Sequence, residues 1–197
     1  MATEVVKRLI KVEEYYKMAE VGILKPEDRV ELINGEIYQM SPIGSRHAAI
    51  VDHLAMRLHQ FLRQEVIVRV QNPIRIDDSN QPEPDIALVK FRPDFFAAAH
   101  PIAADVLALM EVAGSSKRFD REIKSALYAS CGIPVYWIID MGQNRIEVFS
   151  NPKECDYSHS EIYGPEDNIM LMGTKLAVKD LLLLTREIQN ERQNING

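Results

Sequence analysis

The sequence has few cysteines and no long hydrophobic run. Only Cys131 and Cys155 occur among its 197 residues, and their spacing matches neither a disulfide framework nor a metal-binding motif. We therefore expect reduced thiols and a cytoplasmic protein. No apolar run approaches the roughly 20 residues of a membrane span, and the first residues lack a signal-peptide pattern, so we expect no membrane association.

An excess of positive charge is also lacking. The chain has 23 Lys and Arg residues against 29 Asp and Glu residues, which gives a formal net charge of −6 at pH 7. Nucleic-acid binders usually carry a basic surface, so such a role would require a local basic cluster. Phosphate loops, dinucleotide-binding glycine motifs and nucleophile elbows are missing. His47, His53 and His59 are six residues apart, a spacing that makes no zinc pair.

The sequence does contain enough apolar residues for a full core. Hydrophobic residues make up 46% of the chain and charged residues 26%, as in one globular domain. We expect a single domain over residues 1–197, with a core from about residue 8 to about residue 188 and a polar C-terminal tail.

The stretch from residue 106 to residue 140 predicts a strand, a helix and a second strand. Residues 106–112 form an apolar run of the length of a buried strand. A charged helix follows and is stopped by Gly132, and a second apolar strand covers residues 135–139.

Periodicity and turn signals predict further elements on both sides of this unit. We expect helices at residues 11–19, 47–61 and 178–188, a β-hairpin at 29–40 around Asn34-Gly35, and strands at 66–70, 74–76, 86–89, 145–149 and 160–163. Residues 91–104 are expected to be a connection with at most a short helix.

Two carboxylates stand at the ends of apolar strands. Asp85 precedes the run 86–89, and Glu111 lies near the end of the run 106–112. A carboxylate that enters a core is costly unless a cation meets it. If the two strands pair antiparallel, Asp85 and Glu111 lie side by side and suit Mg²⁺ or Mn²⁺. Each residue alone also fits an ordinary structural role, so the prediction rests on the combination.

The helix between the two central strands adds a lysine. Asp120, Lys124 and Tyr128 are four residues apart and share one helix face. That face could return Lys124 to the carboxylates, where an ammonium can orient a metal-bound water or offset charge on a phosphate. The alternative is a solvated Lys124 that forms a surface ion pair with Asp120.

Short motifs follow one another in a fixed order from about residue 8 to about residue 182. They are Glu31-Leu-Ile-Asn-Gly-Glu-Ile, Ser41-Pro-Ile-Gly-Ser-Arg-His47, Gln71-Asn-Pro-Ile, Pro84-Asp85, Glu111-Val-Ala, Asp120-Arg-Glu-Ile-Lys124, Tyr128-Ala and Gly132-Ile-Pro-Val-Tyr-Trp-Ile-Ile-Asp140. In this ordered set the chain resembles the Uma-type family of bacterial restriction endonucleases, within the PD-(D/E)XK nuclease superfamily.

The resemblance implies an α/β fold, in which a mixed sheet flanked by helices forms a restriction endonuclease-like core. It also implies a Mg²⁺-dependent phosphodiesterase site. Asp85 matches the metal-binding aspartate of the family, and Glu111 matches its second acid. Glu31 matches the acid of the N-terminal hairpin, and His47 matches a supporting histidine at the start of the next helix.

The chain departs from the superfamily at one position. The superfamily has a lysine two residues after the second acid, and Ala113 stands there in this chain. Lys124 matches a lysine that the family carries on the following helix instead, with Asp120 in a supporting place.

Two functions therefore remain open. The first is a DNA endonuclease in which Asp85 and Glu111 hold Mg²⁺ or Mn²⁺, Lys124 positions the attacking water and Glu31 completes the catalytic set. The second is a catalytically inactive nucleic-acid-binding or protein-interaction module on the same scaffold.

The expected partners of the nuclease are DNA and a second copy of the chain. Lys117, Arg118 and Arg121 lie near the predicted site in the sequence and are expected to bind the DNA backbone. We expect a homodimer, because a symmetric dimer is the simplest arrangement for cutting both strands.

Overall fold

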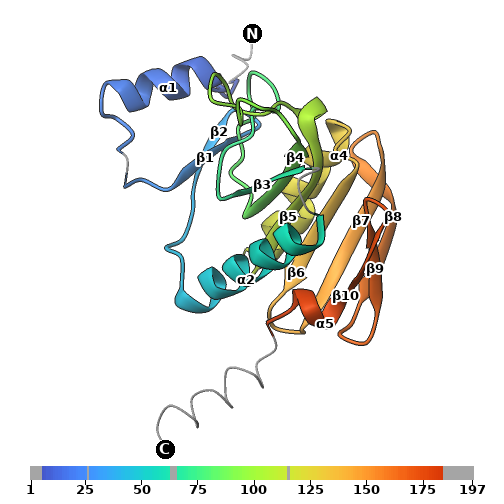
Figure 1. The fold of residues 1–197 in the computed structure, drawn as a ribbon. Helices are drawn as coiled ribbons and strands as arrows, with labels where there is room; N and C mark the ends of the chain where they lie inside the picture. The colour runs from blue at the N-terminus through green and yellow to red at the C-terminus, as the bar shows by residue number, and fades with distance from the viewer. Residues whose placement is uncertain (1–5, 26, 63–65, 115, 184–197) are drawn as a thin grey trace, which may run out of the picture.

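A six-stranded mixed sheet forms the centre of the computed structural model, which describes residues 6–25, 27–62, 66–114 and 116–183. The strands in spatial order are β3 (Val66–Val70), β4 (Ile86–Lys90), β5 (Val106–Ala113), β6 (Val135–Asp140), β7 (Arg145–Lys153) and β8 (Asp156–Tyr163). β5 and β6 are parallel and the other neighbours are antiparallel (Figure 1). The chain therefore has the mixed α/β architecture that was predicted.

The one parallel pair is joined by a helical crossover, because parallel strands cannot be linked by a tight turn. The crossover consists of α3 (Lys117–Phe119), the π-helical turn η2 (Asp120–Lys124) and α4 (Ser125–Ser130). It ends at Gly132, whose φ of +71° is the left-handed conformation that often terminates a helix. This crossover places charged residues at the end of β5.

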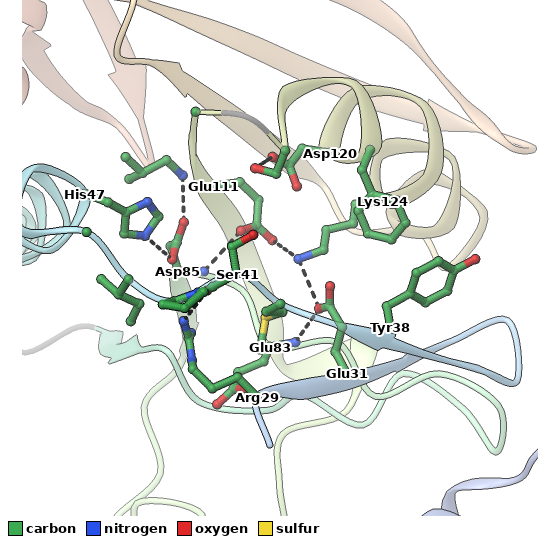
Figure 2. Close-up of a pocket in the computed structure, with 18 of the residues that line it drawn as sticks. Arg29, Glu31, Tyr38, Ser41, His47, Glu83, Asp85, Glu111, Asp120 and Lys124 are labelled. Carbon is green, nitrogen blue, oxygen red and sulfur yellow. Dashed lines mark hydrogen bonds and ion pairs between the residues drawn. The ribbon is translucent and has the colours of Figure 1, made fainter. Parts of the chain in front are cut away.

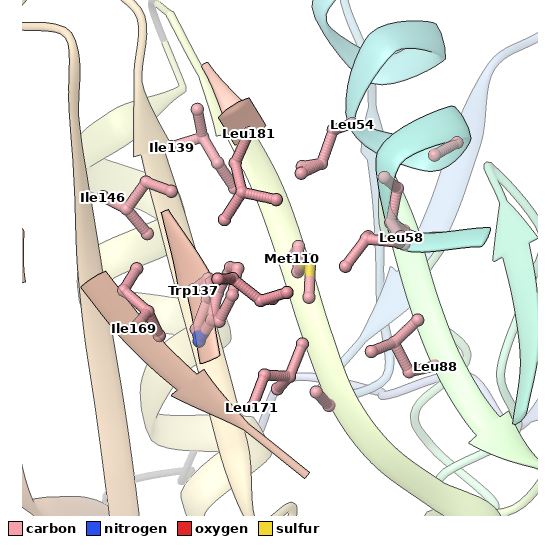
Figure 3. Close-up of a cluster of buried hydrophobic side chains, with 14 of the residues drawn as sticks. Leu54, Leu58, Leu88, Met110, Trp137, Ile139, Ile146, Ile169, Leu171 and Leu181 are labelled. Atoms are coloured by element: carbon pink, nitrogen blue, oxygen red, sulfur yellow. The ribbon is translucent and has the colours of Figure 1, made fainter. Parts of the chain in front are cut away.

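One face of the sheet is covered by α2 (Ser45–Leu62), the hairpin of β9 (Asn168–Leu171) and β10 (Thr174–Ala177), and α5 (Val178–Leu181). Figure 3 shows Leu54 and Leu58 of α2 facing Met110 and Leu88 of the sheet, with Trp137 beside them. All five side chains are fully buried. This packing holds α2 against the sheet, so that the first residues of α2 lie at one end of the sheet.

The opposite face packs against the crossover helices and the hairpin of β1 (Val30–Ile33) and β2 (Glu36–Gln39). Tyr128 of α4 lies in a T-shaped contact with Tyr136 of β6, at 5.0 Å between ring centroids. The remaining elements are α1 (Val12–Glu20), which Figure 1 shows at the end of the molecule beyond the β1–β2 hairpin, and the 3₁₀ turn η1 (Ala103–Asp105).

Most of the predicted elements are confirmed within one to four residues. The Asn34-Gly35 turn has both residues at positive φ, as a two-residue hairpin turn requires. The helix predicted at 47–61 spans Ser45–Leu62, and the strands predicted at 145–149 and 160–163 extend to Arg145–Lys153 and Asp156–Tyr163. Among the residues that the structure describes, no helix has the length and apolar composition that a membrane crossing needs.

Two predictions differ from the structure, and one hairpin was missed. Residues 74–76 form no strand, because after Pro73 the segment makes only an isolated bridge between Arg75 and Ile102. The β9–β10 hairpin was not predicted. The final helix ends at Leu181, since the backbone of Leu182 is extended (ψ 131°), and residues 184–188 of that prediction lie outside the described residues.

Candidate functional site

The two predicted carboxylates lie together on neighbouring strands. β4 and β5 are antiparallel, and their register pairs Ile86 with Met110, which leaves Asp85 opposite Glu111. The backbone N–H of Asp85 donates to Glu111 Oε2 at 3.3 Å, and the N–H of Val112 donates to Asp85 Oδ2 at 2.8 Å. Figure 2 shows both carboxylates pointing into the same pocket.

Asp85 is held as a carboxylate by further donors. Nε2 of His47, at the start of α2, donates to Asp85 Oδ1 at 2.9 Å, and Nε2 of Gln71 donates to the same oxygen at 3.2 Å. Burial alone raises the pKa of Asp85, but the hydrogen bonds from His47, Val112 and Gln71 bring it below its ordinary value. The same hydrogen bond raises the pKa of His47.

Gln71 is a residue that the sequence analysis did not single out for the site. Its backbone has a φ of +48°, a left-handed conformation that is unfavourable for a residue with a side chain. Its N–H donates to the carbonyl of Asp85 at 3.0 Å while its side chain reaches the carboxylate. Strained residues of this kind often occur at functional sites.

Lys124 joins Glu111 to Glu31. Its Nζ lies 3.0 Å from Glu111 Oε1 and 3.0 Å from Glu31 Oε2, and all three side chains are at most 6% exposed. The hydroxyl of Tyr128 also donates to Glu111 Oε1, at 3.3 Å. Burial alone lowers the pKa of Lys124, but the charges of Glu111, Glu31 and nearby Asp120 raise it above its ordinary value. The two carboxylates at 3.0 Å therefore favour the ammonium form of Lys124.

The crossover brings this lysine to the carboxylates as its four-residue spacing predicted. Asp120, Lys124 and Tyr128 are all buried on the side of the crossover that faces the sheet. The alternative of a solvated Lys124 with a surface ion pair to Asp120 is wrong, since Lys124 is paired with Glu31 and Glu111 instead. Asp120 accepts a hydrogen bond from Ser116 Oγ at 2.7 Å, and burial raises its pKa.

A pocket of about 560 Å³ opens over these residues. Five carboxyl groups and three permanent cations line it. The carboxyl groups are those of Glu31, Glu83, Asp85, Glu111 and Asp120, and the cations are Arg29, Arg46 and Lys124. Burial raises the pKa of Glu111 and of Glu83, the nearby Lys124 and Arg29 respectively oppose this, and neighbouring carboxylates raise both pKa values again. The pocket lining thus contains more carboxyl groups than permanent cations.

Each carboxylate of the pair has one oxygen that accepts fewer hydrogen bonds than the other. Asp85 Oδ1 already accepts two hydrogen bonds and Glu111 Oε1 accepts two, whereas Asp85 Oδ2 and Glu111 Oε2 accept one each. Each of the latter two oxygens therefore keeps a lone pair. No group of three or more His, Cys, Asp or Glu residues within the described ranges is arranged to hold a metal ion. Mg²⁺ commonly uses only one or two carboxylates, with water and substrate phosphate as the other ligands, so the pair fits it.

The three basic residues predicted to bind DNA lie elsewhere. Lys117 and Arg121 form ion pairs with Asp140 and Glu147 of the sheet, and Arg118 forms an exposed pair with Glu122. None of the three is among the residues that line the pocket, so their binding of DNA stays a prediction.

Two arginines at the pocket were missed. Arg29 Nη1 donates to the carbonyl of Ser41 at 3.0 Å, and Arg46 Nη2 donates to the carbonyl of Met141 at 2.9 Å. The contact of Arg29 depends on the path of residues 40–44, and that of Arg46 depends on the β6–β7 turn. The sequence pattern predicted neither path. Glu83, two residues before Asp85, was also not recognised as a pocket residue.

Comparisons with known proteins agree with this architecture. A protein-family model described as "Uma2: Putative restriction endonuclease" matches residues 12–181. No curated protein matches the sequence. The structure is similar to that of "a putative nuclease belonging to DUF820 from Anabaena variabilis ATCC 29413", with a TM-score of 0.67 and 16% identity over 87% of this chain and 97% of that chain. At this identity the likeness shows a shared fold.

Proposed function

The chain belongs to the Uma2 family, described as "Putative restriction endonuclease", and from this premise we propose that it hydrolyses DNA phosphodiester bonds with a divalent cation. The observation that carries the proposal is a pair of carboxylate oxygens, Asp85 Oδ2 and Glu111 Oε2, that accept only one hydrogen bond each. They lie in a pocket lined by more carboxylates than cations. A buried carboxyl group keeps its charge more easily when a cation meets it, so an excess of carboxyl groups over cations supports a cation site.

Asp85 and Glu111 would hold Mg²⁺ or Mn²⁺. When bound, the ion supplies Lewis acidity and lowers the pKa of a coordinated water, which provides the attacking hydroxide. His47 and Gln71 fix the orientation of Asp85 through its other oxygen. Lys124 and Tyr128 do the same for Glu111, so each carboxylate presents one defined oxygen.

Lys124 acts as a fixed positive charge in this proposal. Its ammonium is held between Glu111 and Glu31, where it can offset negative charge that develops on a phosphate. Glu31 positions Lys124 and also accepts a hydrogen bond from the N–H of Glu83 at 3.2 Å. Glu31 is therefore a positioning residue, which orients Lys124 and the backbone of Glu83, two residues before Asp85.

The test is cleavage of supercoiled plasmid DNA with Mg²⁺, Mn²⁺ or EDTA. We expect cleavage with either metal, none with EDTA, and a loss of at least about a hundredfold in Asp85→Asn. The matched control is Asp140→Asn, which removes another buried carboxylate outside the pocket lining and should still cut at equal folded concentration. Cleavage by Asp85→Asn at the wild-type rate would contradict the proposal.

A second candidate is the catalytically inactive binding module. The observation in its favour is Ala113, which is 2% exposed and offers no ammonium where the wider nuclease superfamily has one. DNA binding with no cleavage under any metal would favour this candidate. The homodimer also stays a prediction, for which the molar mass in solution is the test.

A further inference from the structure

The proposed reactive groups lie deep in the pocket. The side chain of Asp85 is 13% exposed, that of Glu111 6% and that of Lys124 5%. The pocket volume of about 560 Å³ is that of a site for a small molecule or a single nucleotide. One unpaired nucleotide fits a pocket of this size more readily than a base pair inside a stacked duplex does.

Hydrogen bonds hold the walls of the pocket in place. Arg29 anchors one wall, residues 40–44, through the carbonyl of Ser41 (Figure 2). Arg46 extends from the start of α2 to the carbonyl of Met141 in the β6–β7 turn and so connects two sides of the pocket. Both contacts are to main-chain oxygens, so they tie the arginines to the backbone of the pocket walls.

One wall carries an aromatic pair. Tyr38 of β2 and Phe119 of α3 contact each other at 4.9 Å between ring centroids, and both line the pocket. Tyr38 is the cross-strand partner of Glu31, so its side chain leaves the hairpin on the same face. The pair therefore lies beside the Glu31–Lys124 ion pair. Aromatic side chains are the usual platform on which proteins stack an unpaired base.

We propose that the pocket takes one unpaired nucleotide of a DNA strand. Its base lies against Phe119 and Tyr38, and its phosphodiester reaches Asp85 and Glu111. The substrate class is then single-stranded DNA or a duplex with an unpaired segment. This inference rests on the proposed nuclease function, but it concerns how the strand enters, which can be measured by binding alone.

The experiment measures fluorescence anisotropy of a labelled oligonucleotide in low salt, with Ca²⁺ in place of Mg²⁺. The same strand is presented alone, in a full duplex and in a duplex with a short unpaired segment. We expect the single strand to bind at least about tenfold tighter than the duplex, with the interrupted duplex in between. Equal or tighter binding of the intact duplex, or no binding of any form, would overturn the inference.

Variants of the aromatic wall sharpen the test. Phe119→Ala should weaken binding of the single strand about tenfold and leave duplex binding unchanged. Phe119→Leu keeps apolar volume without a ring and should show the same loss, which separates stacking from a folding defect. The matched control is Phe91→Ala, an exposed aromatic directly after β4, at the end opposite Asp85, and it should bind as wild type. Wild-type binding by both Phe119 variants would contradict the assignment of this wall.

The outcomes for the two proposals are separable. If plasmid DNA is cut and the duplex binds as well as the single strand, the nuclease function stands and the inference fails. If no metal supports cleavage but the single strand is preferred through Phe119, the inference stands and the catalytic proposal fails.

Discussion

Two groups of charged residues lie at the same end of the sheet and differ in how they are neutralised. The pocket cluster consists of Glu31, Asp85, Glu111, Asp120 and Lys124. The strand-end cluster consists of Lys117, Arg121, Asp140, Arg145 and Glu147. The first has four carboxylates and one permanent cation, whereas the second has two carboxylates and three cations.

In the strand-end cluster, both carboxylates are paired with cations. Lys117 Nζ lies 2.5 Å from Asp140 Oδ2, and Arg145 Nη2 lies 3.0 Å from Glu147 Oε1. Asp140 Oδ1 also accepts the N–H groups of Gly142 and Gln143, at 2.9 and 3.1 Å. These donors bring the pKa of Asp140 below its ordinary value although burial opposes them. Such a cluster fixes the β6–β7 turn and the start of the crossover, and its carboxylates leave no need for a further cation.

The pocket cluster has more carboxyl groups than cations. Burial raises the pKa values of Glu111 and Asp120, Lys124 opposes this, and neighbouring carboxylates raise both values again. Buried charge by itself therefore does not mark a functional site. What distinguishes the pocket is the excess of carboxyl groups over cations together with unfilled acceptor positions.

The largest effect on stability is expected from removing the one permanent cation of the pocket cluster. Lys124→Met leaves Glu31 and Glu111 buried without their ammonium, which should cost about 3–5 kcal/mol of unfolding free energy. Urea denaturation at neutral pH measures this loss. Addition of Mn²⁺ should restore part of it.

The matched control is Lys117→Met in the strand-end cluster. Lys117 is 31% exposed and its partner Asp140 keeps other donors, so the loss should be about 1 kcal/mol and independent of Mn²⁺. If Lys124→Met and Lys117→Met lose the same unfolding free energy, the carboxylates of the pocket cluster do not depend more strongly on their cation than those of the strand-end cluster.

An intermediate effect is expected from acid. Because the folded pKa of Asp140 is depressed, its carboxylate stabilises the protein above its unfolded pKa of about 3.9, and that contribution is lost as pH falls through the folded value. On acidification from above about pH 3.9 to below the folded pKa, the unfolding free energy of wild type should therefore fall by on the order of 1 kcal/mol more than that of Asp140→Asn. Urea denaturation at a series of pH values measures the difference. Identical pH profiles would refute the assigned role of Asp140.

The smallest effect is expected at an exposed pair outside both clusters. Arg118 and Glu122 are 87% and 55% exposed, so Arg118→Ala should change the unfolding free energy by less than about 0.5 kcal/mol. If Arg118 binds a phosphate, the variant should lower the salt slope of DNA binding by about one unit. Arg92→Ala, which removes an exposed pair with Asp94 on another loop, is the control. An unchanged slope in Arg118→Ala would exclude Arg118 from the DNA interface.

The central part of the site could be predicted from sequence because it depends on local patterns. Apolar runs next to Asp85 and Glu111 predicted two buried strands, and their antiparallel pairing brought the acids together. The four-residue spacing predicted that Lys124 and Tyr128 share a helix face, and both contact Glu111. The first inference assumed that the two strands pair, whereas the second needed only the spacing along one helix.

The rest depends on contacts between segments that no local pattern determines. Lys117 and Arg121 look like free basic residues in the sequence, and only the register of β6 and β7 reveals their partners Asp140 and Glu147. The β9–β10 hairpin turns at Met172-Gly173, a weaker turn signal than Asn34-Gly35, and its strands are short. Ile74 is fully buried but follows Pro73 in irregular backbone, so its apolar signal was misread as a strand.

The most direct test of the account is whether the pocket cluster binds a divalent cation. The measurement is the thermal unfolding midpoint of wild type, Asp85→Asn and Asp140→Asn over a titration with Mn²⁺. Since an ion that binds only the folded state raises the midpoint with concentration, wild type and Asp140→Asn should shift upward in parallel, while Asp85→Asn should not respond. A midpoint of wild type that Mn²⁺ leaves unchanged, or an equal shift in Asp85→Asn, would contradict the account.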